Sequence, residues 1–207
     1  MSADIRPMFP LGMVLFPGVG LPLRIFEPRY RALTKHCLET GDGFGIVLIA
    51  TGTEVGGGDD RFDVGTMARI VKADVAPDGQ ANIVVVGTER FRVQRWMDDA
   101  PYPQARVENL EDADSTSHDI VSSFVRRVRR MLAQRAELNL ASPPATIELA
   151  DDPALALWQA CALLPTDAHD DLALLASPSV AARIELLDRL LVAIEAKNSR
   201  LLGGEVE

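Results

Sequence analysis

The spacing of apolar residues along the chain changes near residue 112. Before that point, apolar residues either alternate with polar ones or form short continuous runs, as in β-strands. From Asp112 onward they recur every three or four positions, as on one face of an α-helix. The sequence therefore predicts an α+β chain, with a β-rich part at about residues 7–112 and an α-helical part at about 113–200. No low-complexity linker separates them, so we expect a change of structural class rather than a flexible hinge.

A strand-to-helix junction stands out in the β-rich part. Residues 21–25 place aliphatic side chains at alternate positions, which is typical of a half-buried strand. Because Pro22 has no N–H to donate, this strand is predicted at a sheet edge or beside a bulge. Pro28 favours the first turn of a helix that runs to about Thr40, and Gly41 is a suitable C-terminal stop.

The other segments of the β-rich part are short and are separated by turn signals. Further strands are predicted at residues 44–48, 63–75, 80–87, 90–96 and 102–110. A turn with Asp78 and Gly79 joins two of them. Several short strands with one inserted helix indicate a small barrel or sandwich.

The α-helical part contains amphipathic segments with clear start signals. One predicted helix buries a stripe of apolar residues: Ile120, Val121, Phe124, Val125, Val128, Met131 and Leu132. The last predicted helix carries a second stripe: Val180, Ile184, Leu187, Leu191 and Ile194. Asp152 with Pro153, and Ser177 with Pro178, have the residue types of an N-cap followed by a first helical turn.

Arginines cluster on the first of these helices. Arg126, Arg127, Arg129 and Arg130 lie within about one and a half turns, so they cannot all face one direction. Arg126 and Arg130 share a side, and we expect them to form an exposed strip that contacts an acidic partner. The alternative is a solvated face with partial pairing to nearby acids.

Several motifs of the β-rich part occur in a fixed order. They are Phe9-Pro10-Leu11, Leu15-Phe16-Pro17-Gly18, Leu23-Arg24-Ile25-Phe26-Glu27-Pro28-Arg29-Tyr30, Gly65-Thr66-Met67-Ala68-Arg69-Ile70 and Gly87-Thr88-Glu89-Arg90-Phe91. This ordered set resembles the N-terminal substrate-binding domain of Lon proteases. The resemblance implies a PUA-like pseudo-barrel followed by a helical subdomain, in a free-standing form that binds polypeptide segments without catalysis.

Composition and charge limit the kind of protein. The formal net charge of −9 repels phosphate backbones and disfavours nucleic-acid binding. No apolar run approaches the roughly 20 residues that span a bilayer, and no signal-peptide pattern opens the chain, so we expect no membrane association and a cytoplasmic location. The two cysteines, Cys37 and Cys161, are expected to be buried reduced thiols.

Motifs for catalysis, metal binding and cofactor binding are absent from the sequence. It contains no H-E-x-x-H, G-x-S-x-G, C-x-x-C or P-loop pattern. The glycine-rich loop at residues 51–61 has no lysine, and its aspartates would repel phosphate, so nucleotide binding there is rejected. We therefore expect no catalytic residue, no metal and no cofactor, and neither ATP hydrolysis nor peptidase activity.

The leading hypothesis is a non-enzymatic module that binds apolar or aromatic polypeptide segments and acts as an adaptor or regulator of proteolysis. It would use an apolar groove or strand addition at a sheet edge. The candidate contact residues are Phe26, Arg29, Tyr30, Arg90, Phe91 and Trp96. The arginines would orient carboxylates or backbone carbonyls, and the alternative for each aromatic ring is core packing. Phe26 in particular is also expected to anchor the helix to the barrel.

Two other functions remain open at this point. A small-ligand sensor would need an apolar pocket with a few convergent polar groups between the barrel and a helix. RNA binding is suggested by the similarity of such a barrel to RNA-modification-type barrels, although the net charge disfavours it. The sequence identifies neither the partner nor the oligomeric state.

Overall fold

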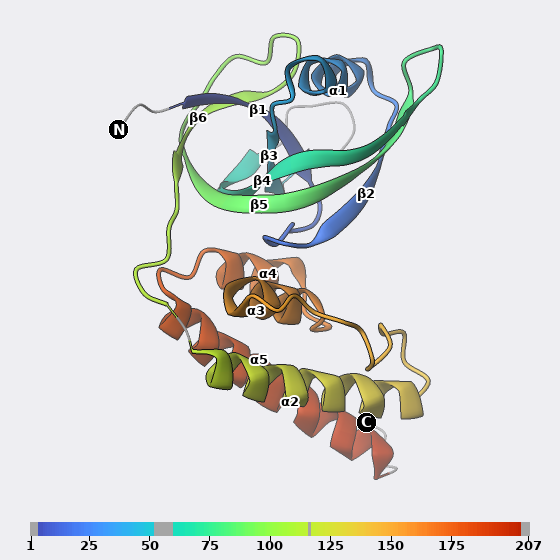
Figure 1. The fold of residues 1–207 in the computed structure, drawn as a ribbon, viewed down its shortest axis with the longest axis vertical. Coiled ribbons are helices and arrows are strands. Elements are labelled where there is room, and N and C mark those ends of the chain that lie inside the picture. Colours follow the sequence, from blue (N-terminus) through green and yellow to red (C-terminus); the bar gives the residue numbers. More distant parts are fainter. Residues whose placement is uncertain (1–3, 52–59, 116, 204–207) are drawn as a thin grey trace. The chain divides into compact units, whose positions relative to one another are not determined.

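The computed structural model describes residues 4–51, 60–115 and 117–203 (Figure 1). The chain divides into two compact units, one up to Glu111 and one from Asp112. The first unit contains all of the described strands, and the second contains only helices, so the α+β class is confirmed. Most of the glycine-rich loop considered above, residues 52–59, lies outside the described residues.

The first unit is a small barrel with one helix. Its elements are β1 (Asp4–Leu11), β2 (Gly20–Ile25), α1 (Pro28–Thr40), β3 (Phe44–Thr51), β4 (Asp60–Val75), β5 (Ala81–Trp96) and β6 (Gln104–Asn109). The strand order is β2-β5-β4-β3-β1-β6, and β5 also pairs with β6. This additional pairing closes five strands into a barrel and leaves β2 outside the closure, with β5 as its strand neighbour (Figure 1). The prediction that Pro22 lies on an edge strand is confirmed.

Two features of the sheet differ from the sequence-based expectation. Strands expected separately at 80–87 and 90–96 form one strand, β5, with register shifts in its pairing. At Gly87 the backbone of β5 passes so close to Phe16 that an added Cβ would lie 2.3 Å from the Phe16 carbonyl oxygen. Glycine therefore permits this close approach and does not mark a strand end. The other difference is β1, which pairs in parallel with β3 although its two prolines gave no strand signal.

Aromatic side chains fill the barrel core. Phe9 of β1 stacks on Tyr30 of α1 with ring centroids 4.0 Å apart, and Phe44 lies 5.8 Å from Phe9. Leu33 and Cys37 of α1 belong to the same buried cluster. A second cluster surrounds Phe91 of β5. The helix is thus fixed by one face that packs into the barrel.

Local signals place the ends of α1 and the β4–β5 hairpin as predicted. Pro28 is the first residue of α1, and Gly41 ends the helix at φ +78° with its N–H donating to Cys37 O. In the hairpin, Gly79 has φ +83°, and the Asp78 carboxylate accepts hydrogen bonds from the backbone and side chain of Gln80. The Gln80 backbone hydrogen bond is the main cause of a lowered pKa of Asp78, and desolvation acts in the opposite direction.

The second unit consists of α2 (His118–Glu137), α3 (Pro153–Ala162), α4 (Ala168–Leu175) and α5 (Val180–Leu202). On α2 the buried residues are Val121, Phe124, Val128, Met131 and Leu132, which confirms most of the predicted stripe. Ile120, in the first turn of α2, is 45% exposed. On α5, Val180, Leu187 and Leu191 are buried as predicted, whereas Ile184 and Ile194 are half-buried.

One of the two predicted helix caps is correct. Asp152 caps α3 by accepting a hydrogen bond from Leu155 N–H. The prediction for α5 is wrong, because Ser179 is its N-cap and accepts from Ala182 N–H. Ser177 instead donates from its hydroxyl to Ala173 O at the end of α4. The Ser-Pro pair lies in the connection, and the helix starts two residues later than its residue types suggested.

A buried arginine joins α5 to the start of the second unit. Arg183 is 1% exposed, and its two terminal nitrogens donate to the two carboxylate oxygens of Asp112, one at 3.2 Å. Its guanidinium lies 3.5 Å from the ring centroid of Trp158 on α3. Three segments that are distant in sequence are therefore held together by one side chain.

Both cysteines are buried, which confirms that part of the prediction. Burial, assisted by the charge of Asp42, raises the pKa of Cys37 to about 11. Burial raises the pKa of Cys161 to about 12, although nearby Arg183 acts in the opposite direction. The folded protein therefore keeps both thiols in the unreactive protonated form.

The free energy of unfolding is expected to fall as the pH rises from about 9 to about 11. Unfolded thiols lose their protons near the ordinary pKa of 9.0, while folded Cys37 keeps its proton up to about 11, so deprotonation favours unfolding. Urea unfolding at several pH values would measure this slope. A Cys37→Ala variant should have a shallower slope than the wild type. Equal slopes in the two proteins would contradict the assignment of this pH dependence to Cys37.

Candidate functional site

The junction between β2 and α1 exposes an aromatic ring. Phe26 is 48% exposed, although Ile25 before it and Tyr30 after it are 1% and 4% exposed. Ile25 is the last residue of β2 and points into the core, so the next side chain points to the opposite face before the helix begins. The expectation that Phe26 anchors the helix to the barrel is wrong. Tyr30 and Leu33 anchor it instead.

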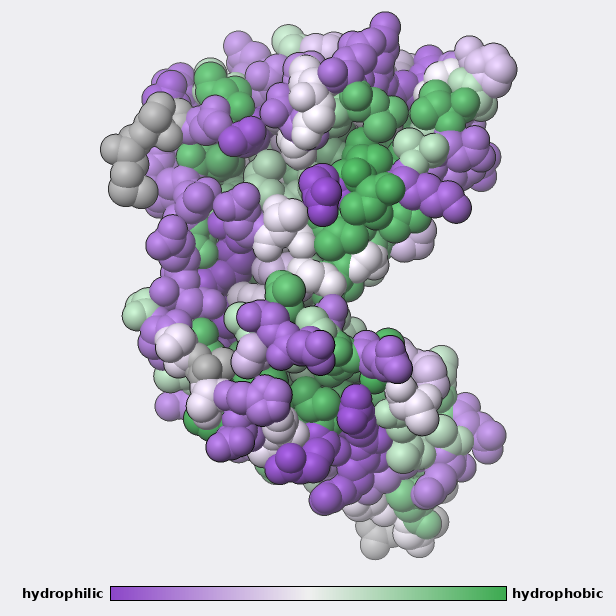
Figure 2. All heavy atoms as spheres, viewed as in Figure 1, coloured by the Kyte–Doolittle hydropathy of each residue, from purple (hydrophilic) through white to green (hydrophobic). Residues whose placement is uncertain are grey.

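A shallow depression of about 160 Å3 lies beside the Phe26 ring. Its lining is mainly apolar, with one basic and one acidic residue: Phe9, Leu11, Pro22, Leu23, Arg24, Phe26, Glu27 and Tyr30. In Figure 2, hydrophobic side chains gather on the face of the first unit that carries β2. We call this surface, together with β2, the Phe26 corner.

The backbone of β2 offers hydrogen-bonding groups at its outer edge. Gly87 N–H donates to Val19 O at 3.0 Å, and bonding toward the neighbouring strand alternates along an antiparallel pair. Leu21 and Leu23 therefore bond toward β5, whereas residues 20, 22 and 24 direct their backbone groups outward. Because Pro22 lacks an N–H, this edge has three outward acceptors but only two outward donors.

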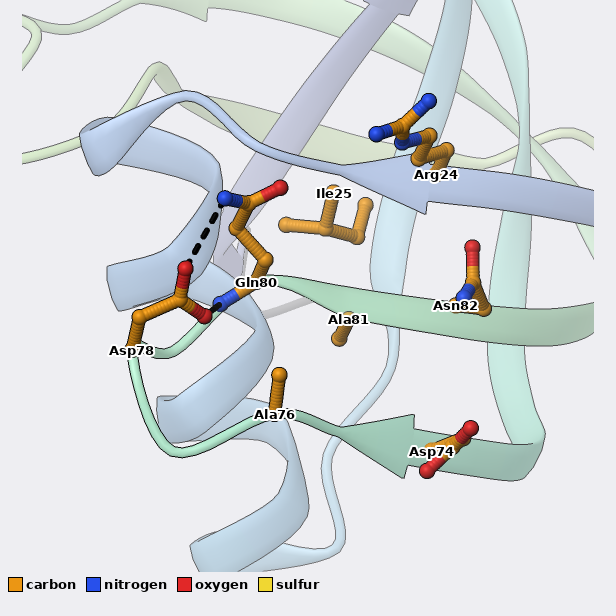
Figure 3. A pocket seen from close by; sticks show the side chains of 8 residues that line it. All are labelled: Arg24, Ile25, Asp74, Ala76, Asp78, Gln80, Ala81 and Asn82. Atoms are coloured by element: carbon orange, nitrogen blue, oxygen red, sulfur yellow. Dashed lines mark hydrogen bonds between the residues drawn. The ribbon is translucent and has the colours of Figure 1, made fainter.

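A more polar depression also borders β2. It has a volume of about 460 Å3 and lies between β2 and the β4–β5 hairpin (Figure 3). Figure 3 shows Arg24, Asp74 and Asn82 along its strands, with Asp78 and Gln80 bonded to each other at the turn. This lining is mostly polar, and the Asp78 carboxylate is occupied by the turn. It differs from the apolar pocket that a small-ligand sensor would need.

Tyr30 lines the Phe26 corner, and Arg29 contacts two of the lining residues. The Tyr30 ring is buried against Phe9, and the Arg29 guanidinium lies 4.4 Å from its centroid. Arg29 Nε also donates to the Glu27 carboxylate at 3.2 Å. The Arg29–Glu27 pair stabilises the first turn of α1. Because the Arg29 guanidinium is bound to Glu27 and lies against Tyr30, it affects the corner only through these two residues.

The remaining three predicted contact residues lie along β5, away from this corner. Phe91 is 0% exposed and Arg90 4%, so neither side chain presents a surface in this structure. Trp96 is half-buried at the end of β5 opposite to the Ala81 end that pairs with β2, and Arg61 lies 4.7 Å from its ring centroid. Arg90 and Phe91 are therefore not part of the candidate site, because they are buried. Trp96 is not part of it either, because it lies at the other end of β5.

Sequence reasoning missed six of the residues that line the depression: Phe9, Leu11, Pro22, Leu23, Arg24 and Glu27. Pro22 was the available signal, since its edge position predicts an unpaired strand next to Phe26. Among the residues that the structure describes, no group of three or more His, Cys, Asp and Glu side chains is placed to hold a metal ion. No helix in the described part of the chain has the length and apolar character needed to cross a membrane.

Comparison with known sequences identifies the fold family. The model of the ATP-dependent protease La (LON) substrate-binding domain matches residues 5–193. Lon protease 2 of Myxococcus xanthus is 32% identical over 150 residues, which cover 72% of this chain and 18% of that protein. Lon protease of Anaeromyxobacter dehalogenans is 30% identical over 149 residues, which cover 71% of this chain and 18% of that protein. The chain thus spans less than a fifth of the length of these two relatives.

Solved structures agree with this assignment. A Lon N-terminal domain protein from Xanthomonas campestris matches with a TM-score of 0.65 and 31% identity, covering 91% of this chain and 98% of that one. The N-terminal domain of Mycobacterium avium complex Lon protease has the same coverage and a TM-score of 0.62, and at 18% identity it supports the fold alone. The chain belongs to the LON substrate-binding domain family.

Proposed function

We propose that this chain binds unfolded polypeptide segments at the Phe26 corner, without catalysis, and serves as an adaptor or regulator of proteolysis. The observation that carries the proposal is a half-exposed aromatic ring beside an apolar depression and an edge strand. Single exposed apolar residues are ordinary on a protein surface. Their combination with a strand edge is what favours a polypeptide, and the family of substrate-binding domains supports the same class of ligand.

Strand addition would supply affinity with little dependence on sequence. An extended segment beside β2 would donate to the outward carbonyls of residues 20, 22 and 24 and accept from the amides of Gly20 and Arg24. One of its side chains would enter the depression of about 160 Å3 next to Phe26, a volume suited to a single apolar residue. Arg24 and Glu27 at the rim would interact with flanking charges of either sign.

Replacement of Phe26 by alanine is expected to weaken binding of an unfolded polypeptide by about tenfold or more, as for a central aromatic contact. The free energy of unfolding should fall by less than about 1 kcal/mol, because the ring is 48% exposed. Fluorescence anisotropy with a labelled, reduced and alkylated protein would measure the affinity, and urea unfolding would measure the stability.

Ile5→Ala is a matched control, because Ile5 is 44% exposed on β1, where it pairs with β6 rather than with β5. The control should bind as the wild type does. A peptide that is N-methylated at alternate amides should bind more weakly than its unmodified form if a strand is added. Equal binding by the Phe26 and Ile5 variants would refute the proposed site.

A further inference from the structure

We propose that the helical unit carries a second, separate binding site, which accepts an acidic polypeptide segment with apolar side chains. The site is a groove of about 310 Å3 between the N-terminal half of α2 and the segment that leads into α3. We call it the α2 groove. It goes beyond the function proposed above, because it lies in the other unit and recognises charge.

The four clustered arginines of α2 have different environments. Arg127 is half-buried and pairs with Asp188 and with Glu195, the latter at 3.0 Å. The hydrogen bonds to Glu195 and then Asp188 raise its pKa. This arginine is neutralised within the helical unit and stabilises the packing of α2 on α5.

Two other arginines line the α2 groove. Arg126 and Arg129 are exposed, three residues apart on one side of the helix, and have no ion-pair partner within the described residues. The Arg129 guanidinium donates to Ile147 O at 3.4 Å, which directs it over the segment before α3. Arg126 and Arg130 are both exposed, as expected of the strip, and of these two only Arg126 lines the groove.

The groove also has an apolar floor. Val121 and Ala156 are 3% and 5% exposed, and Val125 beside them is half-buried. Two guanidinium groups above aliphatic side chains match a segment that alternates carboxylates with apolar residues. Asp151 lies in the same lining, which disfavours a uniformly anionic polymer such as nucleic acid.

The charge of the whole chain makes this groove distinctive. The formal net charge is −9, so the chain as a whole repels an acidic ligand at long range. At short range, two arginines without an ion-pair partner among the described residues would attract its carboxylates. The groove therefore combines local positive charge with an apolar floor.

The test uses a fluorescein-labelled, unstructured peptide that repeats Asp-Leu-Glu-Ser, with the full chain at low ionic strength. The Arg126→Glu/Arg129→Glu variant is expected to weaken binding by about tenfold or more. The control variant Arg130→Glu/Arg189→Glu carries the same change of charge on exposed residues outside the groove and should weaken it by less than about threefold. Phe26→Ala should leave this binding unchanged, which separates the result from the function proposed above.

Any of four results would overturn the proposal. They are equal losses in the two double variants, absence of binding by the wild type, and equal binding of a peptide in which serine replaces leucine or of a single-stranded RNA of similar length. Unchanged Trp158 fluorescence of each variant, measured in a Trp96→Phe background, would confirm that the helical unit is folded. A Val125→Asp variant, which places an acid on the floor, should weaken binding by at least as much as one of the arginine changes.

Discussion

Replacement of Asp112 by alanine is expected to lower the free energy of unfolding of the helical unit by about 3–5 kcal/mol. Arg183 is 1% exposed, and Asp112 neutralises its charge with two hydrogen bonds. Without the carboxylate, a buried guanidinium would keep only its contact with the Trp158 ring among these interactions. Its Nε already has no hydrogen-bond partner among the described residues, so little else compensates.

The loss of stability caused by Asp112→Ala can be measured for the helical unit alone. The chain has two tryptophans, Trp96 in the barrel and Trp158 in the helical unit, so a Trp96→Phe background reports on the helical unit alone. Urea unfolding followed by Trp158 fluorescence gives the free energy. Arg183→Met combined with Asp112→Ala should recover much of the loss, because no unpaired charge remains. If the single and double variants are equally destabilised, the ion pair is not the cause.

Replacement of Phe91 by alanine is expected to destabilise the barrel by about 3–5 kcal/mol. Phe91 has no exposed surface, and its ring fills the space over two glycines of the neighbouring strands. An added Cβ at Gly45 or Gly65 would lie 2.7 Å from the tip of this ring. Since the backbone on both sides is fixed by strand pairing, the cavity left by the ring cannot close easily.

A Trp158→Phe background isolates the barrel, because Trp96 packs against the cluster that contains Phe91. Phe91→Leu is the matched control and should cost less than Phe91→Ala, since it retains most of the buried volume. A loss below about 1 kcal/mol together with loss of polypeptide binding would reverse the assignment. Phe91 would then be a contact residue, as the sequence pattern alone allowed.

The candidate site was partly predictable. Pro22 indicated an edge strand, and the structure places β2 at the outside of the sheet. The exposure of Phe26 was not predictable, because Phe26 and Phe91 each stand next to a charged residue and their sequence neighbours do not decide which ring is buried. Only the turn of the chain after Ile25 directs one ring outward, and only barrel closure encloses the other.

The sequence by itself determined the features that depend on a few neighbouring residues. These include the α+β class, the first turn and end of α1, the Asp78 hairpin and the Asp152 cap. Capping, turn geometry and hydrophobic period act over less than about two turns of chain, so their signals are readable locally. The side-by-side positions of Arg126 and Arg129 on α2 follow from the same rule.

Tertiary structure alone decided which of these residues are available to a ligand. The parallel pairing of β1 with β3, the pairing of β1 with β6 and the burial of Arg183 against Asp112 join segments that are tens of residues apart. Such pairings depend on the whole core, since many alternative partners satisfy the local pattern equally well. For the same reason, only the folded structure shows that the Phe26 ring is exposed. It also shows that Arg126 and Arg129 line a groove, whereas Arg127 is paired with Glu195.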